Sequence, residues 1–291
     1  MFQGTYTAMI TPFRDGDVDF DRLRANVAYQ IEHQVDGLVP VGTTGESPTL
    51  SHDDHRRVIE CVVEAAAKRV TVIAGTGSNS TREALQLTEH AREVGADAAL
   101  MVNPYYNKPT QDGLVHHFMA VADGVELPIV MYNIPGRTGI TMMPKTVAQL
   151  AEHPHIVGIK EATGSMDIAS QIMCLCDPDR FTILSGDDSL TLPLMSIGAR
   201  GVISVLSNLT PDRVKALTNA ASAGDMQEAR RLHTGLFPLC DAMFIETNPI
   251  PVKTAMALKG WDSGELRLPL CPMAQENQAK LEAALRRAGV I

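Results

Sequence analysis

From residue 5 to about residue 205, short apolar segments of the chain alternate with longer amphipathic ones. The short segments are rich in Val and Ile and apolar throughout, which is typical of parallel strands covered on both faces. The longer segments have the length of helices. We therefore predict strands at residues 5–11, 37–42, 71–77, 98–103, 128–133, 156–162, 181–186 and 201–205.

Several of the intervening segments carry helix-start signals. Ser51 is a suitable N-cap before an acidic first turn, and Ser80 with Glu83 has the spacing of a capping box. Pro144 and Pro211 stand where prolines of the first helical turn are expected. These signals support a regular alternation of strand and helix.

Eight parallel strands with covering helices predict a (β/α)₈ TIM barrel in an α/β protein. The alternative, a doubly wound sheet, would require a glycine-rich phosphate loop after the first strand. Residues 11–16 read Thr-Pro-Phe-Arg-Asp-Gly, which is not such a loop. We assign residues 1–223 to the barrel.

After residue 206 the pattern becomes helical, and no convincing strand follows. We predict helices at residues 210–222, 225–246, 249–259 and 274–288. The first of them completes the barrel. Since no low-complexity linker separates the rest, we expect residues 224–291 to form a C-terminal helical extension packed on the barrel.

Composition limits the classes of partner. The formal net charge of −9 and the absence of a basic cluster argue against nucleic-acid binding. No segment approaches the roughly 20 apolar residues of a membrane span, and the first residues do not resemble a signal peptide. The cysteines are odd in number and lack a disulfide pattern, so we expect a cytoplasmic protein with packed, reduced thiols. They are Cys61, Cys174, Cys176, Cys240 and Cys271.

Lys160 is the strongest candidate for chemistry, because active sites of such barrels lie at the C-terminal ends of the strands. It follows the apolar segment 156–159 and faces the same way as Ile156 and Gly158. If that side is the barrel interior, burial lowers the pKa of the lysine, and the neutral amine can form a Schiff base with a carbonyl substrate. The alternatives are a lysine that reaches solvent at the rim or one paired with Glu161.

Other strand ends offer hydroxyls and a cation. Tyr132 and Thr43 could move protons at such a lysine, although a core tyrosine is the commoner reading of Tyr132 alone. Arg137 has the planar fork that suits a carboxylate, although an isolated loop arginine is usually solvated. Thr44 could help to bind a second carboxylate.

Metal and phosphate chemistry have weaker support. His52 and His55 are spaced i, i+3, which is not a zinc motif, and Gly75-Thr76-Gly77 follows the third strand rather than the seventh or eighth. We therefore predict no metal and no cofactor.

Three segments together resemble the dihydrodipicolinate synthase (4-hydroxy-tetrahydrodipicolinate synthase) family of class I aldolases. They are Gly42-Thr43-Thr44-Gly45-Glu46, Tyr132-Asn133-Ile134-Pro135-Gly136-Arg137-Thr138-Gly139 and Gly158-Ile159-Lys160-Glu161-Ala162. The resemblance covers essentially the whole chain. It implies a Schiff-base carbon–oxygen lyase that condenses pyruvate with L-aspartate 4-semialdehyde in lysine and diaminopimelate synthesis.

The resemblance also implies roles for single residues. Lys160 matches the Schiff-base lysine, and Thr43, Tyr132 and Tyr106 match the proton-relay hydroxyls, the last donated by a neighbouring subunit. Arg137 matches the residue that holds the semialdehyde carboxylate. Thr44, Gly186 and Ile203 match positions around the bound 2-oxo acid.

Lysine-sensitive members of the family have an allosteric site at a tight dimer interface of a homotetramer. The matching positions are Ser47, Pro48, His52, His55, Asn79, Glu83 and Tyr105. Glu83 would hold the ammonium of an inhibitory L-lysine, whereas Pro48 departs from the small residue expected there.

Two other hypotheses remain open at this point. The chain could be a related lyase that acts on N-acetylneuraminate or a 2-keto-3-deoxy sugar acid, or a silent barrel that binds an amino acid. The presence of Thr43, Tyr132, Arg137 and Lys160 disfavours the silent barrel, and the Thr43-Thr44 pair with Arg137 favours the synthase over the lyase.

Overall fold

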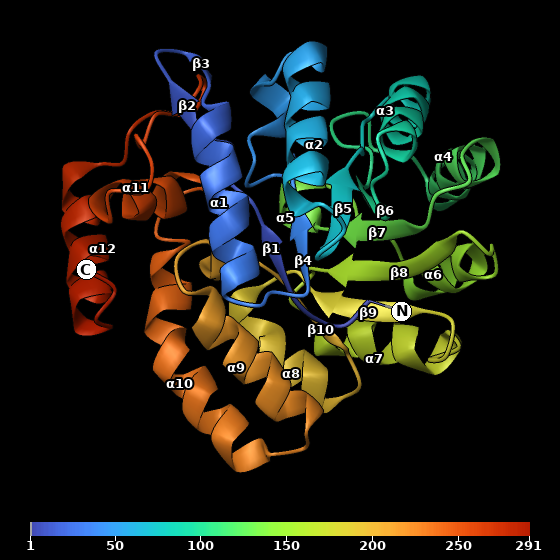
Figure 1. Ribbon diagram of the computed structural model, residues 1–291. Helices are drawn as coiled ribbons and strands as arrows, with labels where there is room; N and C mark the ends of the chain where they lie inside the picture. Colours follow the sequence, from blue (N-terminus) through green and yellow to red (C-terminus); the bar gives the residue numbers. More distant parts are fainter. Residues whose placement is uncertain (1) are drawn as a thin grey trace.

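The computed structural model describes residues 2–291, and its centre is a closed barrel of eight parallel strands (Figure 1). The strands, in the order in which they neighbour one another, are β1 (Gly4–Ala8), β10 (Gly201–Ser204), β9 (Thr182–Ser185), β8 (Ile156–Glu161), β7 (Ile129–Asn133), β6 (Ala98–Val102), β5 (Thr71–Gly75) and β4 (Gly37–Val39). Pairing of β1 with both β4 and β10 closes the barrel. The predicted TIM barrel and its strand positions are confirmed.

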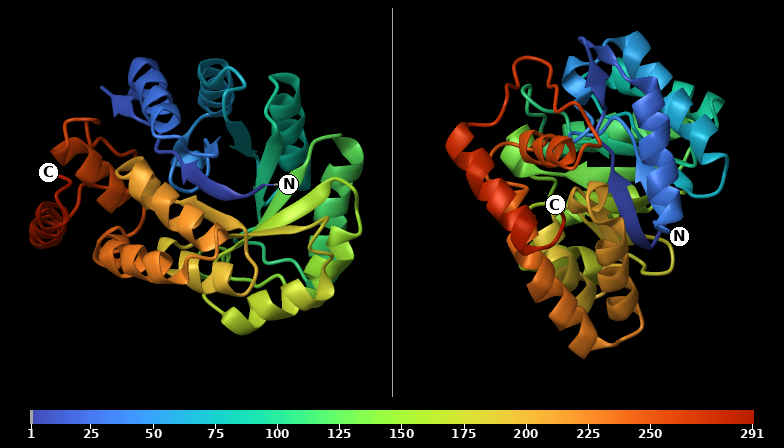
Figure 2. Two further views of the ribbon diagram at one scale, coloured as in Figure 1. Left: turned by 60° about the horizontal axis from the view of Figure 1, so that its bottom comes forward. Right: turned by 60° about the vertical axis from the view of Figure 1, so that its left-hand side comes forward.

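Helices surround the barrel and cover the outer faces of the strands (Figures 1 and 2). They are α1 (Phe20–Glu32), α2 (His52–Ala66), α3 (Thr81–Glu93), α4 (Gln111–Gly124), α6 (Pro144–Ala151), α7 (Met166–Leu175), α8 (Thr191–Ser196) and α9 (Pro211–Ser222). Short turns add η1 (Ser47–Thr49), α5 (Pro135–Thr138), η2 (Asp188–Leu190) and η3 (Leu206–Asn208). A hairpin of β2 (Phe13–Arg14) and β3 (Asp17–Val18) was not predicted, because strands of two residues leave no periodic signal.

The helix-start signals are confirmed with one exception. Ser51 caps α2 by accepting a hydrogen bond from the Asp54 N–H, and α6 and α9 each begin at the predicted proline. Ser80 caps α3 by accepting from the Glu83 N–H at 3.4 Å. The Glu83 carboxylate, however, accepts from the Ser78 hydroxyl, and the Ser80 N–H donates to Ser78 Oγ instead. The second hydrogen bond of the predicted capping box is therefore wrong.

Three C-terminal helices pack against one side of the barrel, where Figure 2 shows them in orange and red. They are α10 (Met226–Ala242), α11 (Ile250–Leu258) and α12 (Gln275–Arg287). Leu239, Val252 and Leu281 from these helices share one apolar cluster with Val202 of β10 and Leu217 of α9. The extension is thus continuous with the barrel through its core.

The described residues contain no helix with the length and apolarity needed to cross a membrane. Cys61, Cys176 and Cys240 are buried, as expected of packed thiols. Cys174 and Cys271 are exposed, so the expectation of packing was wrong for these two, which lie on the outer side of α7 and in the loop before α12.

A fully buried ion pair ties the extension to the turn after β4. Lys253 of α11 donates to Glu46 Oε1 at 2.7 Å and to the Thr11 carbonyl at 2.9 Å, and neither charged side chain is exposed. The second carboxylate oxygen of Glu46 accepts from the Arg267 N–H at 3.0 Å. Because both charges are desolvated, the pair holds its geometry only while both partners are present.

We predict that Lys253→Met lowers the free energy of unfolding by about 3–5 kcal/mol, because it leaves Glu46 charged and buried. Adding Glu46→Gln to this variant should restore part of the loss. Chemical denaturation of the purified variants measures both values. Lys280→Ala, which breaks the exposed pair with Glu276, is the control and should leave the midpoint unchanged.

Candidate active site

Lys160 and Tyr132 occupy paired positions on adjacent strands. The register of β7 and β8 places Tyr132 opposite Lys160, so their side chains point to the same side of the sheet. That side is the barrel interior, because Tyr132 packs there with Val130 and Leu184. Lys160 Nζ lies 4.3 Å from the centre of the Tyr132 ring.

The sequence alone left open a lysine at the solvent rim or one paired with Glu161. Lys160 is only 5% exposed, which excludes the rim. Glu161 points to the opposite side of β8, where it accepts from the Thr163 N–H at 2.7 Å and from Asn133. Lys160 is thus not paired with Glu161.

Burial lowers the pKa of Lys160 to about 8, since the apolar barrel disfavours the ammonium form. The negative charge of Asp188 opposes this shift, and the positive charge of Arg137 adds to it. At pH 7 about a tenth of the amine is therefore neutral, compared with about one part in three thousand for an ordinary lysine. A neutral amine with a free lone pair is the nucleophile that imine formation needs.

Tyr132 is held as a neutral phenol. Burial raises its pKa to about 12, while the charge of Arg137 and the nearby Thr43 hydroxyl act in the opposite direction. Because the phenol keeps its proton at neutral pH, it can donate that proton to an oxygen at the lysine and recover it.

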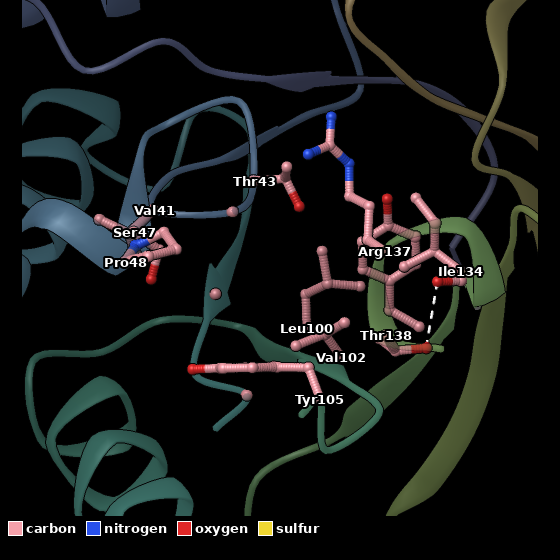
Figure 3. A pocket seen from close by; sticks show the side chains of 14 residues that line it. Val41, Thr43, Ser47, Pro48, Leu100, Val102, Tyr105, Ile134, Arg137 and Thr138 are labelled. Atoms are coloured by element: carbon pink, nitrogen blue, oxygen red, sulfur yellow. Dashed lines mark hydrogen bonds between the residues drawn. The ribbon is translucent and has the colours of Figure 1, made fainter. Parts of the chain in front are cut away.

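A pocket of about 220 Å³ opens at this end of the barrel (Figure 3). Thr43, Tyr132 and Arg137 line it, together with apolar residues such as Leu100 and Ile134. Figure 3 shows the Thr43 hydroxyl and the Arg137 guanidinium on one side of the pocket and Tyr105 on the opposite side. Lys160 is not among the residues that line this pocket, but its Nζ contacts the ring of Tyr132, which is. The volume suits a small molecule of the size of a 2-oxo acid.

Two glycines make room for this arrangement. A Cβ on Gly186 would lie 3.1 Å from Lys160 Cε and 2.7 Å from the Cβ of Ala162. A Cβ on Gly75 would lie 2.4 Å from the carbonyl oxygen of Val41, at the start of the turn that carries Thr43. Val41 itself has a φ of 49°, which is strained for a β-branched residue and is found where a site needs an unusual backbone.

The other predicted 2-oxo acid positions, Thr44 and Ile203, are both buried. Ile203 of β10 lies in the barrel interior with Tyr132 and is inaccessible to solvent. Thr44 is 3% exposed, and its hydroxyl accepts a hydrogen bond from Asn248 Nδ2 at 3.0 Å. Thr44, Gly186 and Ile203 are thus close to the site but do not line the open pocket.

Arg137 lies in the short helix α5, at the exposed rim of the pocket. Its Nη2 donates to the carbonyl oxygen of Asn248 at 2.9 Å, so it is anchored rather than freely solvated. Asn248 was missed in the sequence, where it fell between two predicted helices. The Asn248-Pro249 dipeptide marks a break in helical structure, but it carries no sign of contact with residues 44 and 137.

Asp188 was also not singled out, although it lies in the Ser185-Gly186-Asp187-Asp188 segment. It accepts hydrogen bonds from Ser204 at 2.5 Å and from the N–H groups of Val205 and Leu206. Burial raises its pKa, and these bonds oppose the rise. Asp188 fixes the loop that follows β9 onto the end of β10.

Tyr105 and Tyr106 have different surroundings. Tyr105 lines the pocket, whereas Tyr106 is 90% exposed and points away from it. Tyr106 also has a φ of 70°, so the backbone at this position is not extended. The structure of the single chain therefore does not bring Tyr106 to Lys160.

A second, polar pocket of about 140 Å³ adjoins the first. Six of the seven predicted lysine-site residues line it, namely Ser47, Pro48, His52, His55, Glu83 and Tyr105. Asn79 is not among its lining residues, and its carbonyl accepts from Asn107. Glu83 pairs with His52 at 3.0 Å, and burial lowers the pKa of His55 to about 4, so His55 is neutral.

Comparison with known proteins identifies the family. The dihydrodipicolinate synthetase family matches residues 1–288. The chain belongs to this family. The 4-hydroxy-tetrahydrodipicolinate synthase of Geotalea uraniireducens is 56% identical over the full length of both chains.

Solved structures of the dihydrodipicolinate synthetase family agree closely with the fold. The chloride-inhibited dihydrodipicolinate synthase of Acinetobacter baumannii, in complex with pyruvate, is 45% identical over all of both chains, with a TM-score of 0.97. The enzyme of Cyanidioschyzon merolae, with lysine bound, is 40% identical over 100% of this chain and 99% of its own, with a TM-score of 0.96.

We predict that the rate of imine formation rises with pH up to about 8 and then levels off, because only the neutral form of Lys160 attacks a carbonyl. Below that point the rate should fall about tenfold per pH unit. Quenching a reaction with pyruvate by borohydride at timed intervals, across a pH series, measures it. A rate that still climbs tenfold per unit at pH 10 would show that the pKa of Lys160 is not lowered.

Proposed function

We propose that the chain catalyses the condensation of pyruvate with L-aspartate 4-semialdehyde through a Schiff base on Lys160. One observation carries the proposal: a buried amine of lowered pKa lies beside a neutral phenol, and this phenol lines a pocket with a guanidinium at its rim. The activity named for the relatives, 4-hydroxy-tetrahydrodipicolinate synthase, agrees with it.

The reaction starts with attack of Lys160 Nζ on the ketone carbon of pyruvate. The resulting carbinolamine loses water to give an imine, which withdraws electrons from the methyl carbon. Loss of a proton from that carbon gives an enamine, whose carbon adds to the aldehyde of the semialdehyde. The amino group of the adduct then attacks the imine carbon, closes the ring and releases the Lys160 amine.

Tyr132 and Thr43 act as the proton carriers of this sequence. The hydroxyl that leaves the carbinolamine needs a proton, and the Tyr132 phenol lies on the same side of the sheet as the amine. The Thr43 hydroxyl lines the pocket and acts to lower the pKa of the Tyr132 phenol. Thr43 is therefore the next carrier of the proton towards the opening of the pocket.

The two substrate carboxylates take separate sites. Thr44, together with Gly186 and Ile203, serves the carboxylate of pyruvate at the lysine. Arg137 at the rim serves the carboxylate of the semialdehyde, which enters second. Separate sites match the order of the chemistry, because the enamine must form before the aldehyde reacts.

The decisive test treats the protein with pyruvate and borohydride. A reduced pyruvate adduct should appear on Lys160 by mass spectrometry and should be absent in Lys160→Met. Turnover should then require both pyruvate and the semialdehyde. An adduct without turnover of the semialdehyde, together with cleavage of N-acetylneuraminate, would assign the chain to the sugar-acid lyases instead.

Tyr106 completes the proton path from a second copy of the chain. Its 90% exposure leaves it available to a neighbouring subunit, and it does not line the pocket of its own chain. A tight dimer with two-fold symmetry would supply one Tyr106 to each site, and two such dimers would form a tetramer.

We predict that Lys160→Met and Tyr106→Phe are each nearly inactive alone but regain activity when co-expressed. Half of the dimers formed at random are mixed, and one of their two sites has both native residues, so about a quarter of the sites should work. Activity of the co-purified mixture measures this fraction. If Tyr106 acted within its own chain, the mixture would stay as inactive as its parts.

The polar pocket is an inhibitory site for L-lysine. Glu83 supplies a carboxylate for the ammonium of the effector, and the pocket shares Ser47, Pro48 and Tyr105 with the catalytic pocket. An effector that moved this common wall would alter the catalytic pocket directly.

We predict that Glu83→Gln raises the L-lysine concentration needed for half inhibition at least about tenfold, because it removes a charge-assisted contact. Titration of the two-substrate assay with L-lysine gives this value. Glu89→Gln, on the exposed face of the same helix, is the control and should respond like the unmodified protein. Equal sensitivity of all three proteins would place the effector elsewhere or exclude it.

A further inference from the structure

Asn248 connects the two residues that we assign to the substrate carboxylates, Thr44 and Arg137. It lies in the segment between α10 and α11 and is 5% exposed. Its side-chain Nδ2 donates to Thr44 Oγ1 at 3.0 Å, and its backbone carbonyl accepts from Arg137 Nη2 at 2.9 Å. One residue of the C-terminal extension thus contacts a threonine after β4 and an arginine after β7.

The hydrogen bond to Thr44 determines where the threonine proton can go. A hydroxyl has one proton and two lone pairs. Since Asn248 Nδ2 occupies a lone pair of Thr44 Oγ1, the proton of Thr44 points away from Asn248. Within residues 2–291, no acceptor is hydrogen-bonded to this hydroxyl. The proton is therefore available to a bound anion.

The oxygen of the Asn248 side-chain amide indicates that this residue does more than stabilise the fold. Asn248 Oδ1 is buried without a hydrogen-bond partner. A buried, unpaired carbonyl oxygen costs about 1–3 kcal/mol, which is comparable to what the bond to Thr44 contributes. An apolar residue of similar size would thus stabilise the fold about as well, and the amide is explained by what it does to Thr44.

We propose that Asn248 is a positioning residue, which orients the Thr44 hydroxyl as a donor to the carboxylate of the 2-oxo acid. The proposal rests on the function proposed above and deepens it. Through its backbone carbonyl, the same residue anchors Arg137 at the rim. The C-terminal extension therefore completes the substrate pocket and is more than a cover for the barrel.

The test separates pyruvate binding from the rest of the reaction. Asn248→Ala should raise the KM for pyruvate about tenfold or more, the usual loss for a hydrogen bond to a charged group. The pyruvate concentration that half-saturates borohydride trapping should rise by the same factor. The KM for the semialdehyde should change less than about twofold, because the acceptor of Arg137 is a backbone carbonyl.

Asn248→Asp has nearly the same shape and reverses the hydrogen bond. Its carboxylate accepts the Thr44 proton and repels the substrate anion, so the KM for pyruvate should rise further than in Asn248→Ala. If Asn248→Ala fails to fold, as judged by circular dichroism and thermal unfolding, the comparison of Asn248→Asp with the unmodified protein decides. The control is Asn277→Ala, which removes an amide bonded to Glu246 outside the pocket and should leave this KM unchanged.

A double-mutant cycle with Thr44→Val completes the test. In that background Asn248→Ala should have little further effect on pyruvate, because the hydroxyl that it orients is gone. Fully additive losses, or equal losses for both substrates, would overturn the proposal and make Asn248 general support. A protein that forms no pyruvate adduct on Lys160 would instead refute the function itself, so the two failures are distinguishable.

Discussion

The desolvation of one amine is the constraint on which the site depends. The pKa of Lys160 falls from 10.5 to about 8 in the folded chain. A lowered folded-state pKa means that the protonated lysine destabilises the fold at every pH below about 8, and the cost disappears only above the unfolded value. At pH 7 it amounts to about 3 kcal/mol. The barrel must be stable enough to carry this cost, and a closed sheet covered by helices on all sides provides that stability.

The same constraint explains the residues around the amine. A carboxylate beside Lys160 would restore its charge, and the alternation of β8 directs Glu161 to the other side of the sheet. Asp188 is near enough to oppose the shift, but its oxygens are taken by Ser204 and two backbone N–H groups. Gly186 leaves space for the lysine chain. Each feature keeps the amine close to a reactive protonation state without exposing it to water.

Substrate recognition works against the overall charge of the protein. The chain carries a formal net charge of −9, yet both proposed substrates carry a carboxylate that it must hold. Attraction must therefore be local, and Arg137 at the rim with Thr44 in the turn after β4 supply it over short distances. Asn248 joins these two groups, so the C-terminal extension takes part in recognition as well as in packing.

The barrel, its eight strands and the lysine could be read from the sequence, because continuous apolar segments and strand-end residues are local signals. Asn248, the Lys253–Glu46 pair and the interior direction of Lys160 could not, since they join residues far apart in the chain or depend on which side of a strand faces inward. Ser80 and Glu83 show the same limit: the capping spacing was present, but Ser78 and His52 hold the carboxylate. Local patterning thus determines which elements form, and only tertiary packing decides which polar groups meet, because a hydrogen bond depends on distances in space that the order of residues does not contain.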